Sequence, residues 1–458
     1  SSPQVAANSP QPGALRMQLA ADDPPLGDPG AETRLARTAC TTGFTYVLFL
    51  VFGLGSWLTV NGLFTELPLL VAELPEGWRL GSVLAVAVQF ANVGPLLYYG
   101  ARRLALWRDP AGAGEERLAA VATYLVLLLG SASMLGLALL WQATVRLGKA
   151  EHSVPLILLS FTAALADCTS SLLFWRFASD FRPLHVSALA AGEGLSGAVA
   201  SGLSWLQGAS KAEPSFPAGV YFLFLALALL ASCAAFHGLR LSSPARAERR
   251  HPLPGGSSSL ELALPLAGSG SGRGQGCSLA DDRGEAVPIV WGQDVIALLV
   301  LQAWLNVLQN GVSVSCLGLA AKPYGRDVYQ YAQSVALFLD PLASALGFRL
   351  HAGPGALLLA AVCLGGIYGY IVALSLEATT PPLLLAGGGA LLVAVSTTGR
   401  ALTAYTKMRS NVLLQAAAPP GSAGCLLMWS GVAMQTGAFV GSIGMYVLIN
   451  CTGLFRSG

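Results

Sequence analysis

The sequence predicts an all-α polytopic membrane protein with eleven transmembrane helices in two bundles, six in the first and five in the second. Three observations lead to this. Of the 458 residues, 54% are hydrophobic and only 11% are charged, whereas soluble domains are about a quarter charged. The apolar residues come in blocks of roughly 20, enough to cross a bilayer as helices. A polar segment divides six blocks from five, and two helix groups around a central site are common in secondary transporters.

The eleven apolar blocks follow one another along almost the whole chain. The first is not a signal peptide, because it is long, begins beyond residue 40 and has ten successors. The blocks cover residues 43–70, 80–100, 118–143, 153–177, 185–208, 218–240, 289–316, 328–351, 355–376, 382–405 and 424–450.

Two polar segments set the expected domain boundaries. Residues 1–42 lack an apolar stripe, and residues 242–288 contain 21 Ser, Gly or Pro among 47. Neither can bury enough apolar area to offset its ordering entropy, so both are predicted to be disordered and cytoplasmic. This leaves 43–241 as the six-helix bundle, 289–451 as the five-helix bundle and 452–458 as a short extracellular tail.

The basic residues predict the orientation in the membrane. With the N-terminus in the cytosol, the cytoplasmic segments hold 19 of the 26 Lys and Arg residues and the opposite side holds seven. Positive residues concentrate on the cytoplasmic side of membrane proteins. The N-terminus is therefore expected inside and the C-terminus outside. The sequon at Asn450 would then lie outside, although it adjoins both the last block and the chain end.

The eight cysteines are scattered, with no CxxC motif and no His/Cys cluster. The sequence therefore predicts no metal site. Cys316 and Cys451 both fall near the outer ends of blocks. They are either a disulfide or two small apolar residues that are buried separately.

Polar residues in the first block, "GSWLTVNGLFTELPLLVAELPEGW" at 55–78, carry the strongest functional indication. Trp57 and Asn61 are four residues apart and share a helical face, which Phe64 and Thr65 continue. An aromatic ring beside an amide suits a flat heteroaromatic ligand, which can stack on one and hydrogen-bond the other. The alternative is a Trp packed between helices and an Asn bonded to a neighbouring helix.

Glu66 lies in the same block, near its outer end. A carboxylate within the bilayer costs roughly 2.5–3.5 kcal/mol on insertion scales, so such groups usually face a cavity, pair or act in the mechanism. At 100° per residue, Glu66 points about 140° away from Asn61, and Pro68 can bend the chain there. We therefore expect Glu66 to act in gating or in an outer vestibule.

Amide side chains concentrate in two further blocks. The second block contains Gln89 and Asn92, three residues apart and just before Pro95. The seventh block contains four amides, which predict a cavity-lining helix with donors and acceptors for a neutral polar ligand. Hydrogen bonds between helices are the alternative for one or two of these amides. The four amides of the seventh block are Gln302, Asn306, Gln309 and Asn310.

Acids occur in three more blocks, at Asp167, Glu193 and Asp340. Each is either a proton-relay group or a partner in an interhelical hydrogen bond or ion pair. In the ninth block, small residues are expected to allow close helix packing. These residues are Gly365, Gly366 and Gly369.

Two other protein classes can be compared with a transporter. An intramembrane aspartyl protease needs two facing aspartates, for which Asp167 and Asp340 are available. The usual Gly-x-Gly-Asp surround is missing, because Asp340 lies in "FLDPL". A receptor that signals without transport fits a six-plus-five arrangement poorly. The excess of amides over acids also favours passage of a polar solute over hydrolysis.

The first block is similar to the first span of the eukaryotic riboflavin transporter family. Members of this family carry a Gly-Ser-Trp-x-x-Val-Asn-Gly motif, followed by Glu-Leu-Pro and then by Leu-Pro-Glu-Gly-Trp. The similarity runs over most of residues 43–450 and fails in the N-terminal tail and the central linker. The matching residues are Gly55-Ser56-Trp57, Val60-Asn61-Gly62, Glu66-Leu67-Pro68, Leu74-Pro75-Glu76-Gly77-Trp78, Asn310-Gly311 and Pro323-Tyr324-Gly325-Arg326.

This resemblance implies eleven spans, a cytoplasmic N-terminus and a fold like that of equilibrative nucleoside and major facilitator transporters. It also implies a plasma-membrane monomer that takes up riboflavin, with no enzymatic activity, cofactor or nucleic-acid partner. The expected partners are riboflavin and the lipid bilayer. The expected substrate-binding residues are Trp57, Asn61, Thr65, Gln89, Asn92, Asn306, Gln309 and Asn310. The expected gating or proton-sensing residues are Glu66, Asp167, Glu193 and Asp340.

The chain departs from the family pattern in three interior motifs. Gly-Gln-Gly reads Gly192-Glu193-Gly194, Asn-Pro-Leu reads Asp340-Pro341-Leu342, and Ser-Asn reads Ser170-Ser171. Neutral amides have been lost and acids gained. A pH-sensitive uptake of riboflavin is one interpretation, and transport of another small polar heteroaromatic or cationic solute, such as a nucleoside, stays open.

Overall fold

The computed structural model describes most of the chain. The part of the predicted N-terminal tail up to residue 28 and the predicted linker from residue 250 onward lie outside the described residues. The described residues are 29–109, 113–249, 292–376, 387–418 and 423–455.

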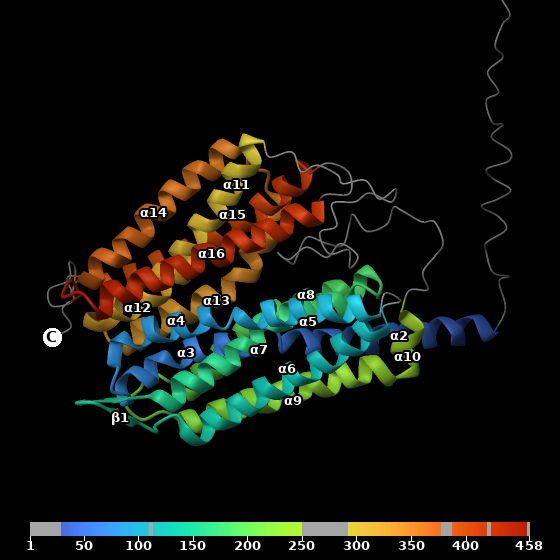
Figure 1. The fold of residues 1–458 in the computed structure, drawn as a ribbon, viewed down its shortest axis with the longest axis horizontal. Coiled ribbons are helices and arrows are strands. Elements are labelled where there is room, and N and C mark those ends of the chain that lie inside the picture. Colours follow the sequence, from blue (N-terminus) through green and yellow to red (C-terminus); the bar gives the residue numbers. More distant parts are fainter. Residues whose placement is uncertain (1–28, 110–112, 250–291, 377–386, 419–422, 456–458) are drawn as a thin grey trace, which may run out of the picture.

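The helices form two bundles (Figure 1). Both run along the long axis of the molecule, with the second bundle above the first in this view. The first bundle contains α2 (Pro29–Leu54), α3 (Leu58–Glu73), η1 (Gly77–Arg79), α4 (Leu80–Phe90), α5 (Val93–Arg108), α6 (Ala113–Leu140), α7 (Val154–Ala178), α8 (Pro183–Gln207), α9 (Ala218–Leu241) and α10 (Ser243–Glu248). A short antiparallel hairpin of β1 (Val145–Leu147) and β2 (Ala150–His152) projects from it between α6 and α7. The second bundle contains α11 (Gln293–Asn306), η2 (Val307–Ser313), α12 (Val314–Ala321), η3 (Lys322–Tyr324), α13 (Arg326–Arg349), α14 (Pro354–Leu376), α15 (Gly388–Ala416) and α16 (Ala423–Asn450).

The apolar helices are long enough to cross a membrane. By length and composition, seven helical segments of the described chain qualify, and the bent pair α2–α3 adds an eighth. Helices α8, α13 and α15 are 25, 24 and 29 residues long but less apolar. Helical segments thus lie over each predicted block, and the chain is a multi-pass helical membrane protein. The number of eleven spans stays a prediction.

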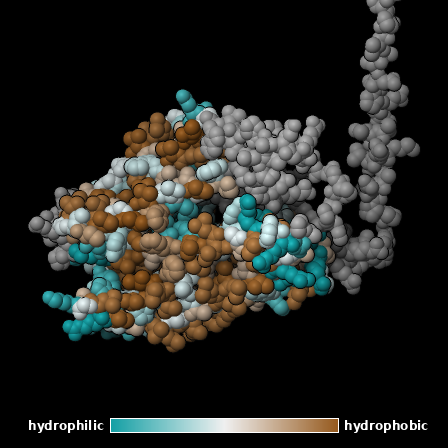
Figure 2. Space-filling view, viewed as in Figure 1, coloured by the Kyte–Doolittle hydropathy of each residue, from teal (hydrophilic) through white to brown (hydrophobic). Residues whose placement is uncertain are grey.

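The surface matches this assignment. Figure 2 shows brown hydrophobic residues over the middle of both bundles and teal hydrophilic residues gathered at the two ends of the molecule. Leu125 is 61% exposed and Val362 is 66% exposed. A monomeric soluble protein rarely exposes a contiguous apolar surface of this extent, so the middle of each bundle is the surface that lipid chains cover.

Glycines allow two close helix crossings. A Cβ on Gly192 of α8 would overlap the carbonyl oxygen of Leu50 in α2, and one on Gly53 of α2 would overlap that of Leu189. In the second bundle, a Cβ on Gly311 of η2 would lie 2.6 Å from the Cα of Gly441 in α16. Only glycine permits backbones to approach this closely.

The expectation for Gly365, Gly366 and Gly369 is wrong. A Cβ on Gly366 or Gly369 would meet nothing within 4 Å, and one on Gly365 would meet only Trp304, at 3.8 Å. Helix α14 instead buries the side chains of Leu364 and Tyr368. Clustering of glycines in a sequence does not show which face of the helix meets a neighbour.

The two bundles are joined at the end of the molecule that carries the β1–β2 hairpin, called the hairpin end below. In Figure 1 the bundles meet at this end and diverge toward the end that carries α10, called the α10 end. Over the described residues, every hydrogen bond between the bundles lies at the hairpin end. These bonds are Gln330 Nε2 to Ser204 O (2.9 Å) and Oγ (3.2 Å), Ser210 N to Gln330 Oε1 (3.3 Å), Arg326 Nη2 to Lys211 O (3.3 Å) and Asn450 Nδ2 to Ser82 Oγ (3.0 Å).

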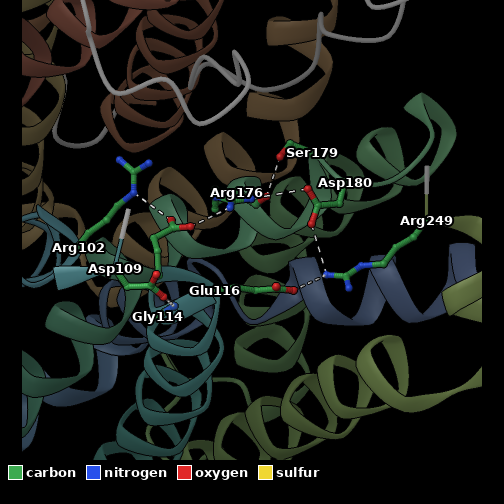
Figure 3. A network of polar contacts seen from close by, with 9 residues as sticks. Arg102, Asp109, Gly114, Glu116, Arg176, Ser179, Asp180 and Arg249 are labelled. Carbon is green, nitrogen blue, oxygen red and sulfur yellow. Dashed lines mark hydrogen bonds and ion pairs between the residues drawn. The ribbon is translucent and has the colours of Figure 1, made fainter. Parts of the chain in front are cut away.

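At the α10 end, ion pairs hold the helices of the first bundle together (Figure 3). Glu115 of α6 accepts hydrogen bonds from Arg102 of α5 and Arg176 of α7, each at 3.0 Å. Arg249, which follows α10, pairs with Asp180 at 3.3 Å, and Arg176 lies 3.6 Å from the same carboxylate. This network ties α5, α6, α7 and the chain after α10 into one unit.

The predicted disorder of residues 242–249 is wrong, because this segment contains α10. Glu248 is 4% exposed and accepts a hydrogen bond from Thr42 at 2.8 Å. It also pairs with Arg182 at 3.3 Å and His185 at 3.4 Å. Ion pairing, which a criterion based on apolar area does not count, thus orders the start of the linker. Likewise, α2 begins at Pro29, ahead of the expected boundary at residue 42.

Docking of α10 should depend on the charge of Glu248. Burial raises the pKa of Glu248, but hydrogen bonds from Thr42 and His185 and the charge of Arg182 outweigh this and leave the pKa below its usual value. A lowered pKa stabilises the docked state above the ordinary carboxyl pKa, and this contribution is lost as the pH falls through the lowered value. We expect Glu248→Gln to speed amide hydrogen exchange in α10 several-fold at neutral pH. Unchanged exchange, as expected for the exposed control Glu213→Gln, would contradict the docking role.

The α2–α8 crossing should not tolerate a side chain. Gly192→Ala should lower stability by about 1–3 kcal/mol, the usual cost of overpacking, and reduce the apparent melting temperature in detergent. The matched control Gly369→Ala adds the same methyl group to a position with no neighbour within 4 Å. Equal melting temperatures for the two variants would contradict the crossing.

Candidate functional site

The centre of the first bundle is organised by a break in its first span. The sequence predicts one helix over 43–70, whereas α2 ends at Leu54, α3 starts at Leu58, and the two are bent by 53°. A break leaves backbone groups that need partners. Ser232 of α9 donates to the carbonyl oxygen of Phe52 at 2.9 Å, and Ser170 of α7 donates to that of Ser56 at 3.0 Å.

Asp167 of α7 caps the start of α3. The N-cap residue of α3, Trp57, makes no side-chain capping bond. Instead, Asp167 Oδ2 accepts from the backbone N–H of Val60 at 2.9 Å. A helix N-terminus carries partial positive charge and stabilises a carboxylate. The acid therefore has a structural partner, and only 1% of it is exposed.

Glu193 of α8 lies beside the same break. Its Oε1 accepts from the indole N–H of Trp57 at 2.8 Å and from Ser56 at 3.4 Å. Its Oε2 accepts from the indole N–H of Trp175 in α7 at 3.1 Å. Among the described residues, no Lys or Arg pairs with this carboxylate. These four side chains, Ser56, Trp57, Trp175 and Glu193, form the acid cluster.

Asn61 adjoins the acid cluster. Along α3 from Leu58 to Val71, every residue except Asn61 is buried. Its Nδ2 donates to Ser196 of α8 at 3.0 Å. A Cβ on the neighbouring Gly197 would lie 3.5 Å from this nitrogen and 3.2 Å from Leu337 of α13. The amide therefore lies where the first bundle meets the second.

Thr65 does not share this environment, contrary to the expectation that it continues the Trp57–Asn61 face. It is 0% exposed, and its hydroxyl lies 2.8 Å from that of Tyr221 in α9. Thr65 is four residues from Asn61 within α3, but Tyr221 of α9 packs on it, whereas Asn61 meets α8. Spacing along one helix does not show which neighbouring helix covers each turn. Thr65 contributes to packing within the first bundle.

In the second bundle, the amides of the seventh block surround a lysine. Lys407 of α15 donates to Asn306 Oδ1 at 2.8 Å and to Gln309 Oε1 at 2.6 Å. Asn310 Nδ2 also donates to Asn306 Oδ1, at 2.9 Å. Gln309 and Asn310 lie in the π-helical segment η2, and such segments occur frequently at functional sites. These residues form the amide–lysine cluster.

Sequence reasoning missed Lys407 as a site residue. The tenth block was expected to end at residue 405, which placed Lys407 in a cytoplasmic loop, where it served only to orient the chain. Helix α15 continues to Ala416, so Lys407 lies inside it and is partly buried. Its four-residue spacing from Thr403 and Asn411, both buried in α15, was the available indication.

Asp340 of α13 pairs with Arg400 of α15 at 2.8 Å, with 24% and 19% of their side chains exposed. Asp340 and Arg400 also interact electrostatically with Lys407. The expected arginine partner is therefore present, and the second bundle holds two cations beside one acid.

The remaining expected site residues lie elsewhere. Asn92, at the α4–α5 junction, donates to the backbone and side-chain oxygens of Gln89, at 3.2 and 3.3 Å. Glu66 is 0% exposed at the hairpin end and accepts from Gln207 at 2.8 Å. Asn450, the sequon residue, bonds Ser82 across the bundles.

The sequence left a disulfide open and predicted no metal site, and the described residues bear on both points. Cys316 and Cys451 are free thiols, and Cys316 is buried. Within the described chain, no group of three or more His, Cys, Asp or Glu side chains could hold a metal ion. The two clusters instead offer groups that suit a polar organic solute, with indole and carboxylate groups in the first bundle and amides and a lysine in the second.

Comparison with known proteins gives the family. The sequence profile described as "Solute carrier family 52, riboflavin transporter" matches residues 41–457. The chain belongs to this family. It is 30% identical to Riboflavin transporter 2 of Salmo salar, over 91% of this chain and 98% of that protein. It is 31% identical to solute carrier family 52, riboflavin transporter, member 2 of Homo sapiens, over 92% of this chain and 97% of that protein.

The fold also resembles a solved transporter structure. A point mutant of the nucleoside transporter NupG superposes with a TM-score of 0.52, 12% identity and coverage of 90% of this chain and 92% of that one. This identity supports the fold alone. Membership of solute carrier family 52 confirms a transporter and not an enzyme, so the aspartyl protease alternative is wrong. In keeping with this, Asp167 and Asp340 are bound to different partners in different bundles.

Removal of the α3 cap should destabilise the first bundle. Asp167→Ala would leave the N–H of Val60 without its acceptor, at a cost of about 1–3 kcal/mol for an unsatisfied buried group. Asp167→Asn keeps one acceptor oxygen and should cost less. Apparent melting temperatures should therefore fall in the order wild type, Asn, Ala. A variant with Ala as stable as wild type would show that the cap contributes nothing.

Proposed function

We propose that the chain carries riboflavin into the cell across the plasma membrane. The observation that carries this proposal is the indole and amide placed together at the α2–α3 break of a solute carrier family 52 chain. Trp57 is held by Glu193 at 2.8 Å and Asn61 by Ser196 at 3.0 Å. Both are therefore oriented before a ligand arrives, which lowers the entropy cost of binding.

The chemistry of riboflavin suits the two clusters. Its flat isoalloxazine ring offers a face to Trp57, and such aromatic pairs contribute about 0.5–1.5 kcal/mol beyond burial. Its imide edge has one N–H donor between two carbonyl acceptors, which the amide of Asn61 can match. Across the bundle interface, Lys407, Gln309 and Asn310 supply donors and acceptors for carbonyl groups or the polyhydroxyl chain.

We further propose that the hairpin end faces outside and the α10 end faces the cytosol. The charge bias along the sequence supports this orientation. The bundles are bonded at the hairpin end and diverge toward the α10 end (Figure 1). In this orientation the structure corresponds to a conformation closed to the outside. Alternating access would then rock one bundle against the other around the central clusters.

The proton-sensing role expected of Glu193 and Asp340 has weaker support. Both oxygens of Glu193 accept hydrogen bonds from N–H or O–H donors, and Asp340 pairs with Arg400. Donors and cations stabilise the charged form of a carboxyl group. We therefore assign these two acids as permanent charges that position Trp57 and Arg400.

A cationic solute is the second candidate substrate. In the described chain Glu193 has donors but no cationic partner, so a ligand amine could supply the missing charge. Competition distinguishes the two candidates, because a cationic substrate would be displaced by cationic heteroaromatics and not by flavins.

Uptake of radiolabelled riboflavin is the direct test. Cells that express the chain at their surface should take up several-fold more riboflavin than control cells, and unlabelled flavin should compete more strongly than nucleosides or amines. Surface protein without added uptake would contradict the proposal.

The two clusters should both contribute to affinity. Asn61→Ala and Lys407→Met each leave polar ligand groups unpaired, which costs about 1–3 kcal/mol or roughly 5- to 150-fold in affinity. Both should raise the riboflavin concentration for half-maximal uptake by such a factor at equal surface expression. Lys149→Met is the matched control, because Lys149 is exposed in the β1–β2 turn and should behave as wild type. If either cluster variant matched this control, that cluster would not contact the substrate.

A further inference from the structure

Glu66 and Gln207 form a buried pair with two unused acceptors. Both side chains are 0% exposed. Gln207 Nε2 donates to Glu66 Oε1 at 2.8 Å and to the backbone oxygen of Phe216 at 3.2 Å. The second oxygen of Glu66 and the oxygen of Gln207 are buried without a hydrogen-bond partner.

The orientation of the Gln207 amide is fixed by its neighbours. Both of its N–H groups are used, one on Glu66 and one on Phe216. A flipped amide would direct its oxygen at the Phe216 carbonyl oxygen, which cannot donate. The unpaired oxygen of Gln207 is therefore an acceptor beside a carboxyl group that also lacks a donor.

One proton resolves both deficits. A proton on Glu66 Oε2 turns this oxygen into a donor to Gln207 Oε1 and completes a cyclic acid–amide pair. We propose that Glu66 and Gln207 are a proton-binding site, occupied when the hairpin end is closed. The proposal rests on the proposed function only for its assignment of the hairpin end to the outside.

The groups around Glu66 offer no substitute charge. Helix α3 packs against α4, α7, α8, α9, α13 and η1. Tyr221 of α9 interacts electrostatically with Glu66, but a neutral phenol does not neutralise a carboxylate. Within the described chain, no charged group at this end of these elements or their flanking turns pairs with Glu66. The charged or titratable groups at this end include Glu73, Glu76, Arg79, Glu151, His152, Lys211, Glu213, Arg326 and Asp327.

The pair sits next to the bonds that close the hairpin end. Gln207 is the last residue of α8, between Ser204 and Ser210, which both bond Gln330 of the second bundle. Separation of the bundles would admit water to this end and allow Glu66 to ionise. An ionised, dry Glu66 disfavours closure, so proton binding favours it.

The linkage sets the sign and the size of the pH effect. Because the closed state binds the proton more tightly, the ratio of closed to open molecules rises as the pH falls. One linked proton changes this ratio by at most about tenfold per pH unit. The charged acids Glu193 and Asp340 have donors or a cation in place and contribute little to this response.

The test measures the distance across the hairpin end in purified full-length protein, without substrate. Spin labels at Lys149 and Asp327, both exposed and in different bundles, report the closed and open populations after reactive native cysteines are replaced by Ser. In wild type, the closed distance should become more populated as the pH falls from about 8 to about 5.5. The ratio of closed to open molecules should rise by up to about tenfold per pH unit. Glu66→Gln, which forms the cyclic pair without a proton, should stay closed and lose the pH response.

Glu76→Gln is the control for this measurement. Glu76 is also an acid at the hairpin end, but its oxygens accept from the backbone and hydroxyl of Ser153 at 2.8 and 2.7 Å. This variant should keep the wild-type response. A second readout is the infrared carbonyl stretch of a protonated carboxylic acid, which wild type should show at neutral pH and Glu66→Gln should lack.

Two results would overturn the proposal. One is a distance distribution that retains its pH response in Glu66→Gln. The other is identical infrared spectra for wild type and Glu66→Gln at neutral pH. Because neither measurement uses riboflavin, failure of the uptake assay and failure of the proton site are separate outcomes.

Discussion

The structure of the central region depends on one interaction, the capping of α3 by Asp167 of α7. A helix that starts in the middle of a membrane protein exposes backbone N–H groups where no water is available to satisfy them. Asp167 accepts from Val60 at 2.9 Å and so allows the first span to break at residues 55–57. The break turns Trp57 toward Glu193, and Asn61 is the one residue between Leu58 and Val71 that is partly exposed.

The charges of the two bundles are unequal. The first bundle presents Glu193, held by indole N–H groups, and the second presents Lys407, held by amide oxygens, beside the Asp340–Arg400 pair. A neutral solute with donors and acceptors at different edges can satisfy both faces at once. At the α10 end, the network around Glu115 and Asp180 joins helices within the first bundle (Figure 3). In the alternating access proposed above, these ion pairs would let the first bundle move as a unit, while the bonds between the bundles would break and form.

Much of the fold could be predicted from the sequence, because apolar blocks of membrane-spanning length are a strong signal. Polarity alone also singled out Trp57, Asn61 and the amides of the seventh block as candidate site residues, and their role in substrate binding stays a prediction. The break at residues 55–57 was not, because its cap comes from Asp167, more than a hundred residues away. Thr65 was misplaced because spacing along α3 does not show that Tyr221 of α9 packs on it, and Lys407 was missed because its helix continues beyond the apolar block.

The four intramembrane acids show most clearly what the sequence lacks. Asp167, Glu193, Asp340 and Glu66 look alike as isolated carboxyl groups in apolar blocks. Their roles differ because of the donors that other helices bring to each oxygen. Asp167 meets a helix N-terminus, Asp340 meets an arginine, and Glu193 meets donors on both oxygens. Asp340 also keeps one oxygen without a hydrogen bond, but the charge of Arg400 lies beside it, whereas Glu66 has one bare oxygen and only a neutral amide as its partner. A buried carboxyl group with both oxygens satisfied can remain ionised, whereas one with a bare oxygen beside a bare acceptor is completed by a proton. The supply of donors, and not the residue type, therefore separates the structural acids from the one suited to respond to pH.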